Sequence, residues 1–270
     1  MASRIASLPM YDLPEARWAT DAWWAGLARA FRAAGVADVP DHLTRSAPYH
    51  GTWTDPNLLF TQTCGYPLTH GFARHLRPLA AIRLAIDGCD GIDYHSLVLV
   101  RAASDVRGLA DLRGAVCAYN NFDSQSGMNT LRHAVATFAR DGRFFARTIE
   151  TGGHRASMIA VKAGTADVCS VDVATYNLLV RHAPSVPQGL RILARTAAAP
   201  GLPYTTRIEA DADKVRRLRA GLAAAAADPD LAAARAALFI AGVEVVERAD
   251  YERVDTMERE ARDLGYPELA

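Results

Sequence analysis

The sequence predicts an α/β protein that folds in two parts. Short apolar segments, partly β-branched, alternate along the chain with segments whose apolar residues recur at helical spacing. Residues 94–101 form a strongly β-branched run, long enough to pass from one part of the molecule to another, and a return passage is expected near 192–196. Between these two passages the pattern is strand, helix, strand, helix, strand.

Composition narrows the class of protein. The chain has 270 residues, half of them hydrophobic, so it can bury a core large enough for one large domain or two smaller lobes. Its formal net charge is zero, and its basic residues are dispersed, which argues against a nucleic-acid partner. No apolar run approaches the roughly 18 residues of a membrane span. Residues 1–10 lack an apolar core of signal-peptide length, so we expect a cytoplasmic protein, or a periplasmic one whose signal has been removed.

The four cysteines are widely separated and show none of the paired spacings of zinc sites. We therefore expect no metal, no cofactor and reduced thiols. Cys117 and Cys169 fall inside apolar predicted strands, where a thiol behaves as a small hydrophobe. Cys64 lies beside Gly65 in a polar loop and is the cysteine with most scope for chemistry.

A polar loop at 119–129 separates a predicted strand at 115–119 from a predicted helix. Leu131 and Val135 recur at helical spacing, and Ser124 or Ser126 is a candidate N-cap. The start of a helix directs unpaired backbone N–H groups and the positive end of a dipole at one place, which suits an anionic or strongly polar ligand. The alternative is an ordinary capped helix.

The N-terminal segment is expected to begin with a strand at 5–10 and a helix that starts at 13–15. Tyr11 lies where the strand ends, a usual position for ligand contacts in α/β sheets. Residues 40–53 are interpreted as a second strand and a polar loop, and residues 55–58 as the start of a helix.

A second apolar run, at 58–62, ends in small and polar residues. Gly65 permits close backbone approach, and Gln62 and Thr63 can donate hydrogen bonds. Tyr66 can cover a ligand with its ring and offers a hydroxyl. The alternative is a plain turn before Pro67.

The remaining pattern predicts further elements on either side of the return passage. His154 starts a helix and faces the end of a strand, and residues 200–204 form a rigid turn that brings Tyr204 toward the ligand. The further strands are expected at 78–86, 144–149 and 166–172, and the further helices at 109–114, 152–163, 174–180, 215–222, 231–238 and 250–264.

Several blocks of residues occur together in the order found in one known family. They are residues 63–67, 109–114, 121–127, 153–157 with 163–168, and 200–204. With these blocks the chain resembles the phosphate, phosphite and phosphonate substrate-binding proteins of ABC transporters, which have the type II periplasmic-binding-protein fold.

The resemblance implies two α/β lobes joined by two hinge strands that close over a small ligand. Lobe 1 would comprise residues 1–95 and 196–270, and lobe 2 residues 96–195. In this family a hydroxyl-rich turn binds the phosphonate oxygens at a helix N-terminus, and Ser124, Gln125, Ser126 and Gly127 match that turn. His154 resembles the family's contact from a second helix. Asp172 matches a position where some members direct a carboxylate at a ligand amine.

Two residues depart from the family pattern. Gln125 replaces the middle hydroxyl, and Asp123 adds a negative charge directly before the turn, which would repel a dianion. A carboxylate, an amide or a zwitterion is therefore a better expected ligand than a dianionic phosphonate.

We expect a solute-binding protein with an ABC permease as partner and no nucleic acid. Its expected ligand contacts are Tyr11, Gln62, Thr63, Gly65, Tyr66, Asp123, Ser124, Gln125, Ser126, Gly127, His154, Asp172 and Tyr204. The alternative is a cytoplasmic enzyme on the same scaffold, of lyase or hydrolase type, acting on a small carboxylate. In that alternative His154 is the acid or base, Asp172 or Asp123 orients it, and Cys64 is a candidate nucleophile.

Overall fold

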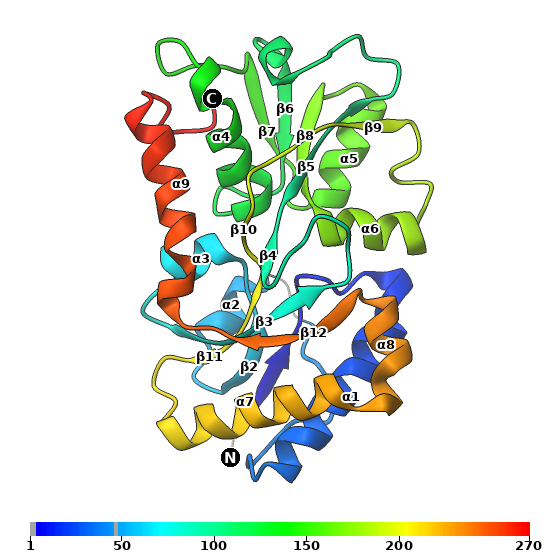
Figure 1. Cartoon of the computed structure of the whole chain (residues 1–270), viewed down its shortest axis with the longest axis vertical. Helices are drawn as coiled ribbons and strands as arrows, with labels where there is room; N and C mark the ends of the chain where they lie inside the picture. The colour runs from blue at the N-terminus through cyan, green and yellow to red at the C-terminus, as the bar shows by residue number, and fades with distance from the viewer. Residues whose placement is uncertain (1–3, 46–47) are drawn as a thin grey trace. The chain divides into compact units, whose positions relative to one another are not determined.

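The computed structural model describes residues 4–45 and 48–270 and divides into two compact units (Figure 1). Unit 1 comprises the chain through Asp93 and Pro200–Tyr251. Unit 2 comprises Tyr94–Ala199 and Glu252–Ala270. The two inner boundaries lie close to the predicted passages. Residues 252–270 belong to unit 2, whereas the sequence analysis assigned them to lobe 1.

Unit 1 contains a five-stranded sheet in the order β1-β2-β11-β3-β12. β1 and β2 run parallel, whereas β11 is antiparallel to both β2 and β3, and β12 is antiparallel to β3. The strands are β1 (Ile5–Ser7), β2 (Leu58–Gln62), β3 (Leu76–Leu84), β11 (Pro203–Arg207) and β12 (Ile240–Val245). β12 was not expected from the sequence, and the start of β11 lies in the segment that was expected to form a rigid turn.

The core of unit 1 is aromatic and lies between its sheet and its long first helix. Trp24 stacks on Phe60 with 6.0 Å between ring centroids, and Phe31 lies 5.1 Å from Phe60. A Cβ at Gly221 would lie 2.4 Å from Phe31, so glycine lets two helices approach closely. The helices of unit 1 are α1 (Arg17–Ala33), α2 (His50–Trp53), α3 (Gly65–Thr69), α7 (Ala212–Ala227) and α8 (Ala232–Ala237), with short 3-10 turns η1 (Pro14–Ala16), η5 (Pro229–Leu231) and η6 (Arg248–Tyr251).

Two expectations for residues 40–58 are wrong. A short helix, α2, occupies the end of the segment interpreted as strand and loop, and residues 46–47 of that segment lie outside the described residues. No helix begins at 55–58. The Asp55 side chain instead accepts a hydrogen bond of 2.7 Å from the backbone N–H of Asn57, a local turn that leads directly into β2.

Unit 2 contains a second five-stranded sheet, in the order β7-β6-β8-β5-β9. β6 runs parallel to β7 and β8, whereas β5 is antiparallel to β8 and β9. The strands are β5 (Ser96–Arg101), β6 (Val116–Tyr119), β7 (Arg147–Glu150), β8 (Val168–Asp172) and β9 (Leu190–Arg195). Two short strands at the unit boundaries, β4 (Asp93–Tyr94) and β10 (Ala199–Pro200), form a separate two-stranded sheet.

The C-terminal segment packs into the core of unit 2, which explains its place there. Helix α9 buries Val254, Met257 and Ala261, and Ala261 and Tyr266 share one apolar cluster with Leu131 of α4. The helical elements of unit 2 are η2 (Leu109–Leu112), η3 (Gln125–Asn129), α4 (Thr130–Val135), η4 (Ala136–Phe138), α5 (His154–Ala163), α6 (Val173–His182) and α9 (Glu252–Asp263). In the described part of the chain, no helix has the length and apolar character to cross a membrane.

Candidate functional site

Three loops of unit 2 leave the same edge of its sheet. β6, β7 and β8 are parallel, so the segments that follow Tyr119, Glu150 and Asp172 all start at their carboxyl ends. This edge is where ligands bind in open α/β sheets. It carries the predicted turn at 123–127, His154 and Asp172.

The first of these loops forms a capped turn, as predicted. Ser124 has extended backbone angles and is the N-cap, and its Oγ accepts a hydrogen bond of 3.0 Å from the backbone N–H of Gly127. The first turn, η3, is a π-helix that continues into α4. π-Helical turns are rare and occur frequently at functional sites.

Ser126 connects this turn to its neighbours. Its Oγ lies 2.9 Å from Nε2 of His154, and its carbonyl oxygen accepts 2.8 Å hydrogen bonds from the hydroxyls of Thr130 and Ser170. Ser170 lies on β8, so contacts from α4 and β8 fix the backbone of Ser126, and a contact from α5 fixes its hydroxyl. The sequence analysis did not identify Thr130 or Ser170, because both lie within predicted regular elements.

His154 is a neutral imidazole at neutral pH. It is the first residue of α5, and burial lowers its pKa from 6.5 to about 4. The Ser126–His154 contact is therefore a hydrogen bond between two uncharged groups. An imidazole with a pKa of about 4 is not protonated at neutral pH, so in the enzyme alternative His154 is suited to act as a base rather than as a general acid.

The backbone at Gly127 lies close to the side chain of Asn120. A Cβ at position 127 would lie 1.9 Å from Oδ1 of Asn120 and 3.3 Å from Cε1 of His154. The Asn120 Oδ1 atom is buried. A larger residue at position 127 would require the Asn120 side chain to move. Asn120 was not among the residues selected from the sequence.

Gln125 faces the C-terminal helix of unit 2. Its Nε2 lies 3.4 Å from the sulfur of Met257, and its Oε1 accepts a hydrogen bond of 2.7 Å from Asn129. Asn129 Nδ2 also donates to the carbonyl oxygen of Val254, at 3.0 Å. The amide that replaces the family's hydroxyl thus helps to join the turn to α9.

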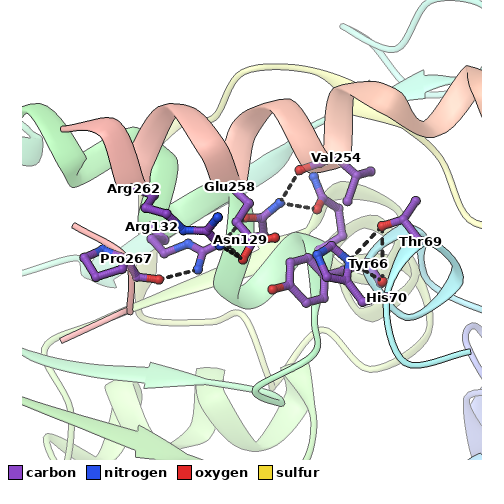
Figure 2. A network of polar contacts seen from close by, with 10 residues as sticks. Tyr66, Thr69, His70, Asn129, Arg132, Val254, Glu258, Arg262 and Pro267 are labelled. Carbon is purple, nitrogen blue, oxygen red and sulfur yellow. Dashed lines mark hydrogen bonds and ion pairs between the residues drawn. The ribbon is translucent and has the colours of Figure 1, made fainter. Parts of the chain in front are cut away.

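A buried cation extends this network (Figure 2). Arg132 is 3% exposed and donates to Oδ1 of Asn129 at 2.6 Å and to the carbonyl oxygen of Pro267 at 2.7 Å. Its guanidinium lies 3.8 Å from the carboxylate of Glu258, which also pairs with Arg262 at 2.9 Å. The network holds the C-terminal segment against the helix that follows the turn.

The two candidate carboxylates have different positions. Asp172 is buried at the end of β8, and its Oδ1 caps α6 by accepting a hydrogen bond of 2.8 Å from the backbone N–H of Thr175. Asp123 is partly exposed and immediately precedes the Ser124 cap. Asp123 and Asp172 thus lie on two of the three loops at this edge.

Unit 1 brings three predicted residues together around one small cavity. Tyr11, Gln62 and Tyr204 line a cavity of about 20 Å³, together with Leu8, Thr20, Trp23, Ile82, Leu238 and Ile240. Gln62 and Tyr204 are paired across β2 and β11, and the Tyr204 hydroxyl accepts a hydrogen bond of 2.8 Å from Trp23. Burial raises the pKa of Tyr204. The remaining walls are mainly aliphatic, which suits a small apolar group.

The other predicted residues of unit 1 lie on or beside α3 rather than in an open loop. Gly65 and Tyr66 form its first turn, and Cys64 is the residue at its N-cap position. The Tyr66 ring stacks on His70 with centroids 3.8 Å apart, and the His70 ring bonds Thr69 at 2.8 Å (Figure 2). Thr63 is fully buried before this helix. In the described part of the chain, no group of three or more His, Cys, Asp or Glu residues is arranged to hold a metal.

Comparison with known structures establishes the fold. A binding-protein component of an ABC phosphonate transporter from Pseudomonas aeruginosa matches 98% of this chain and 88% of its own, with a TM-score of 0.78 and 15% identity. PhnD1 of Prochlorococcus marinus, solved with methylphosphonate, matches 96% of this chain and 98% of its own, with a TM-score of 0.74 and 12% identity. A Xanthomonas citri protein solved with ATP covers 98% of both chains, with a TM-score of 0.71 and 19% identity.

The α/β units and these structural similarities define the periplasmic-binding-protein fold. The family model described as the periplasmic substrate-binding protein of phosphonate ABC transporters matches residues 58–251. This match spans more than half of the chain, so the protein belongs to that family, which confirms the resemblance stated from the sequence. No curated protein sequence matches the chain.

Proposed function

We propose that this solute-binding protein holds a small singly charged anion or zwitterion at the turn formed by Ser124, Ser126 and Gly127, with His154 and Asp172 beside it. The Ser126–His154 hydrogen bond of 2.9 Å carries the proposal, because it fixes a hydroxyl and an imidazole at the ligand-binding edge of a sheet. Tyr11, Gln62, Thr63, Gly65, Tyr66 and Tyr204 of unit 1 are proposed as further ligand contacts, and Asp123 and Gln125 as residues that shape the turn.

The electrostatics of the turn support a ligand of low charge. Ser124, Ser126 and Gly127 are neutral, and His154 is neutral above its pKa of about 4. Hydroxyl and N–H donors can hold an oxyanion without a formal cation. The carboxylate of Asp123, next to Ser124, favours one negative charge over two, and a ligand amine would add a partner for Asp123 or Asp172.

The solved relatives suggest which probes to use first. One was solved with methylphosphonate and another with ATP, so both hold a ligand that carries phosphorus oxyanions. We propose a panel of methylphosphonate, 2-aminoethylphosphonate, phosphate, acetate and glycine, each measured by thermal unfolding at neutral pH. A true ligand present at 100 times its Kd should stabilise the folded state by about 2.7 kcal/mol.

Ser126→Ala provides the residue-level test. It removes one hydroxyl from the turn, and we expect the affinity for the best probe to fall by about 10- to 150-fold, since a hydrogen bond to a charged group is worth about 1.5–3 kcal/mol. Ser185→Ala, at an exposed position of unit 2, is the matched control and should bind as the unchanged protein does. If no probe raises the melting temperature, or if Ser126→Ala binds with full affinity, the proposed site is wrong.

We also propose that this chain works with an ABC permease and resides in the periplasm, as its family's description indicates. Fractionation of cells that express the native gene tests the location. Recovery of the protein in the cytoplasmic fraction alone would contradict it.

A further inference from the structure

A second hollow in unit 1, of about 530 Å³, is rich in arginine. Its lining includes Arg77 of β3, Arg216 and Arg219 of α7, and Arg248 of η6, against one carboxylate, Glu247. The whole chain has 30 basic and 30 acidic residues, so this local excess of positive charge departs from the neutral balance of the protein. The volume falls within the range of about 300–1,000 Å³ that is usual for small-molecule sites.

Two of these arginines make hydrogen bonds with backbone carbonyl oxygens rather than with carboxylates. Arg77 donates to the carbonyl oxygen of Ala210 at 3.1 Å. Arg248 donates at 2.7, 2.7 and 2.9 Å to the carbonyl oxygens of Leu68, Ala73 and Leu76. Among the residues that the structure describes, neither forms an ion pair. A carbonyl oxygen satisfies an N–H donor and leaves the positive charge uncompensated.

The other two arginines each have one acidic partner. Arg219 pairs with Glu247 at 2.7 Å and also donates to the carbonyl oxygens of Leu79 and Val246, at 3.1 and 3.0 Å. Arg216 is exposed and pairs with Asp213 on its own helix. Exposed ion pairs of this kind contribute little to stability, so an incoming anion can replace Asp213 as the partner of Arg216 at low energetic cost.

The guanidinium groups are also held in place. Arg77, Arg219 and Arg248 are partly buried, and their hydrogen bonds to strand and loop carbonyls restrict their rotamers before any ligand arrives. A guanidinium has five N–H donors, and the single bond of Arg77 to Ala210 leaves four. Fixed, incompletely used guanidinium groups are well suited to carboxylate and phosphate oxygens, because little further side-chain entropy is lost on binding.

We propose that this hollow binds a small polyanion carrying two or more phosphate or carboxylate groups. The four arginines come from three elements, so a ligand with several anionic groups can contact more of them at once than a single small anion can. This site consists of unit 1 residues that the proposed ligand site does not use.

Titration calorimetry at about 150 mM NaCl tests the proposal, because exposed charges more than about 8 Å apart are then largely screened. Tripolyphosphate and citrate are the probes, and chloride and acetate at matched ionic strength are the single-charge comparisons. We expect saturable binding of tripolyphosphate or citrate with one site per chain, and no heat of binding from the single-charge anions. The stronger of the two probes identifies phosphate or carboxylate chemistry.

Three variants locate the binding. Arg77→Gln and Arg216→Gln should each weaken polyanion binding about tenfold, and each leaves the three carbonyl contacts of Arg248 in place. Arg29→Gln removes an exposed arginine that pairs with Asp228 elsewhere in unit 1 and should change the Kd less than twofold. Absence of polyanion binding, or equal Kd values for all three variants, overturns the proposal.

Ser126→Ala should bind tripolyphosphate normally. If it does not and Arg77→Gln does, the anion binds at the turn, and the second site is wrong while the proposed function stands.

Discussion

Ser126 Oγ and His154 Nε2 lie 2.9 Å apart and join the loop after β6 to the first turn of α5. Helix α4, the short turn η4 and strand β7 lie between these residues in the sequence, and the parallel order of β6 and β7 brings them to one edge of the sheet. Burial keeps the imidazole neutral in the folded protein, so protonating His154 at low pH is costly. The stability of the folded protein should therefore depend on pH, which is the first prediction.

Stability should fall on acidification because of His154. Its pKa is about 4 in the folded protein and near 6.5 when unfolded, so between these values the unfolded chain binds a proton that the folded chain does not. The contribution of His154 to the free energy of unfolding is complete above about pH 6.5 and decreases as the pH falls toward 4. The loss is about 1.4 kcal/mol per pH unit within this window, about 3 kcal/mol in all.

Urea unfolding of the unchanged protein and of His154→Gln, at pH 7.5 and 4.5, measures this effect. Glutamine can still bond Ser126 but does not titrate, so the variant should lose about 2 kcal/mol less stability between the two pH values. His42→Gln, at an exposed position, is the control for loss of an imidazole and should keep the full pH dependence. An unchanged pH dependence in His154→Gln would show that His154 is protonated equally in both states.

Gly127→Ala should destabilise the protein by about 1–3 kcal/mol, because overpacking forces neighbouring atoms to move. The new methyl group would lie 1.9 Å from Asn120 Oδ1, so Asn120→Ala in the same chain should recover part of the loss. Gly153→Ala is the matched control, since its Cβ would meet no atom within 4 Å. Denaturant unfolding measures all four proteins, and failure of Asn120→Ala to relieve the defect would contradict the assigned clash.

Arg132→Ala should cost about 2–4 kcal/mol, because it removes the donor that satisfies two acceptors around a buried side chain. The change leaves Asn129 Oδ1 and the Pro267 carbonyl oxygen without their guanidinium partner, whereas Glu258 keeps its pair with Arg262. Arg259→Ala, at an exposed position of α9, is the control and should change the free energy of unfolding by less than about 0.5 kcal/mol. Hydrogen exchange should report faster exchange in α9 of Arg132→Ala, and equal exchange in both variants would mean that the network does not hold the C-terminal segment.

Local sequence signals were enough to select the candidate residues. Ser124 and Ser126 are both candidate helix caps, because small hydroxyl residues follow a strand and precede a helical pattern, and in the structure Ser124 is the N-cap. Tyr11, Gln62 and Tyr204 were selected from three separate segments, and they line one cavity. Asn120 and Ser170 were missed because neither residue type nor spacing distinguishes them from ordinary loop and strand residues.

The start of β2 and the place of β12 show the limits of local patterns. Asp55 and Pro56 resemble the first residues of a helix, yet a side-chain turn leads into a strand whose five residues are all buried. β12 contains a glycine and ends in partly exposed residues, and its strand conformation depends on pairing with β3, which is distant in sequence. The conformation of β12 was therefore decided by pairing between distant strands, and the local helix and strand propensities of its residues did not predict it.

By itself, the sequence determined the α/β class, the family, the order of most elements and the position of the capped turn that begins at Ser124, because strand and helix periodicities, caps and family blocks are local properties. Only the tertiary structure decided that residues 252–270 pack with unit 2 and that the Gln125 side chain bonds Asn129. It also decided that burial keeps His154 neutral. Each of these depends on contacts between residues far apart in the chain, whose desolvation and hydrogen bonding no local pattern records.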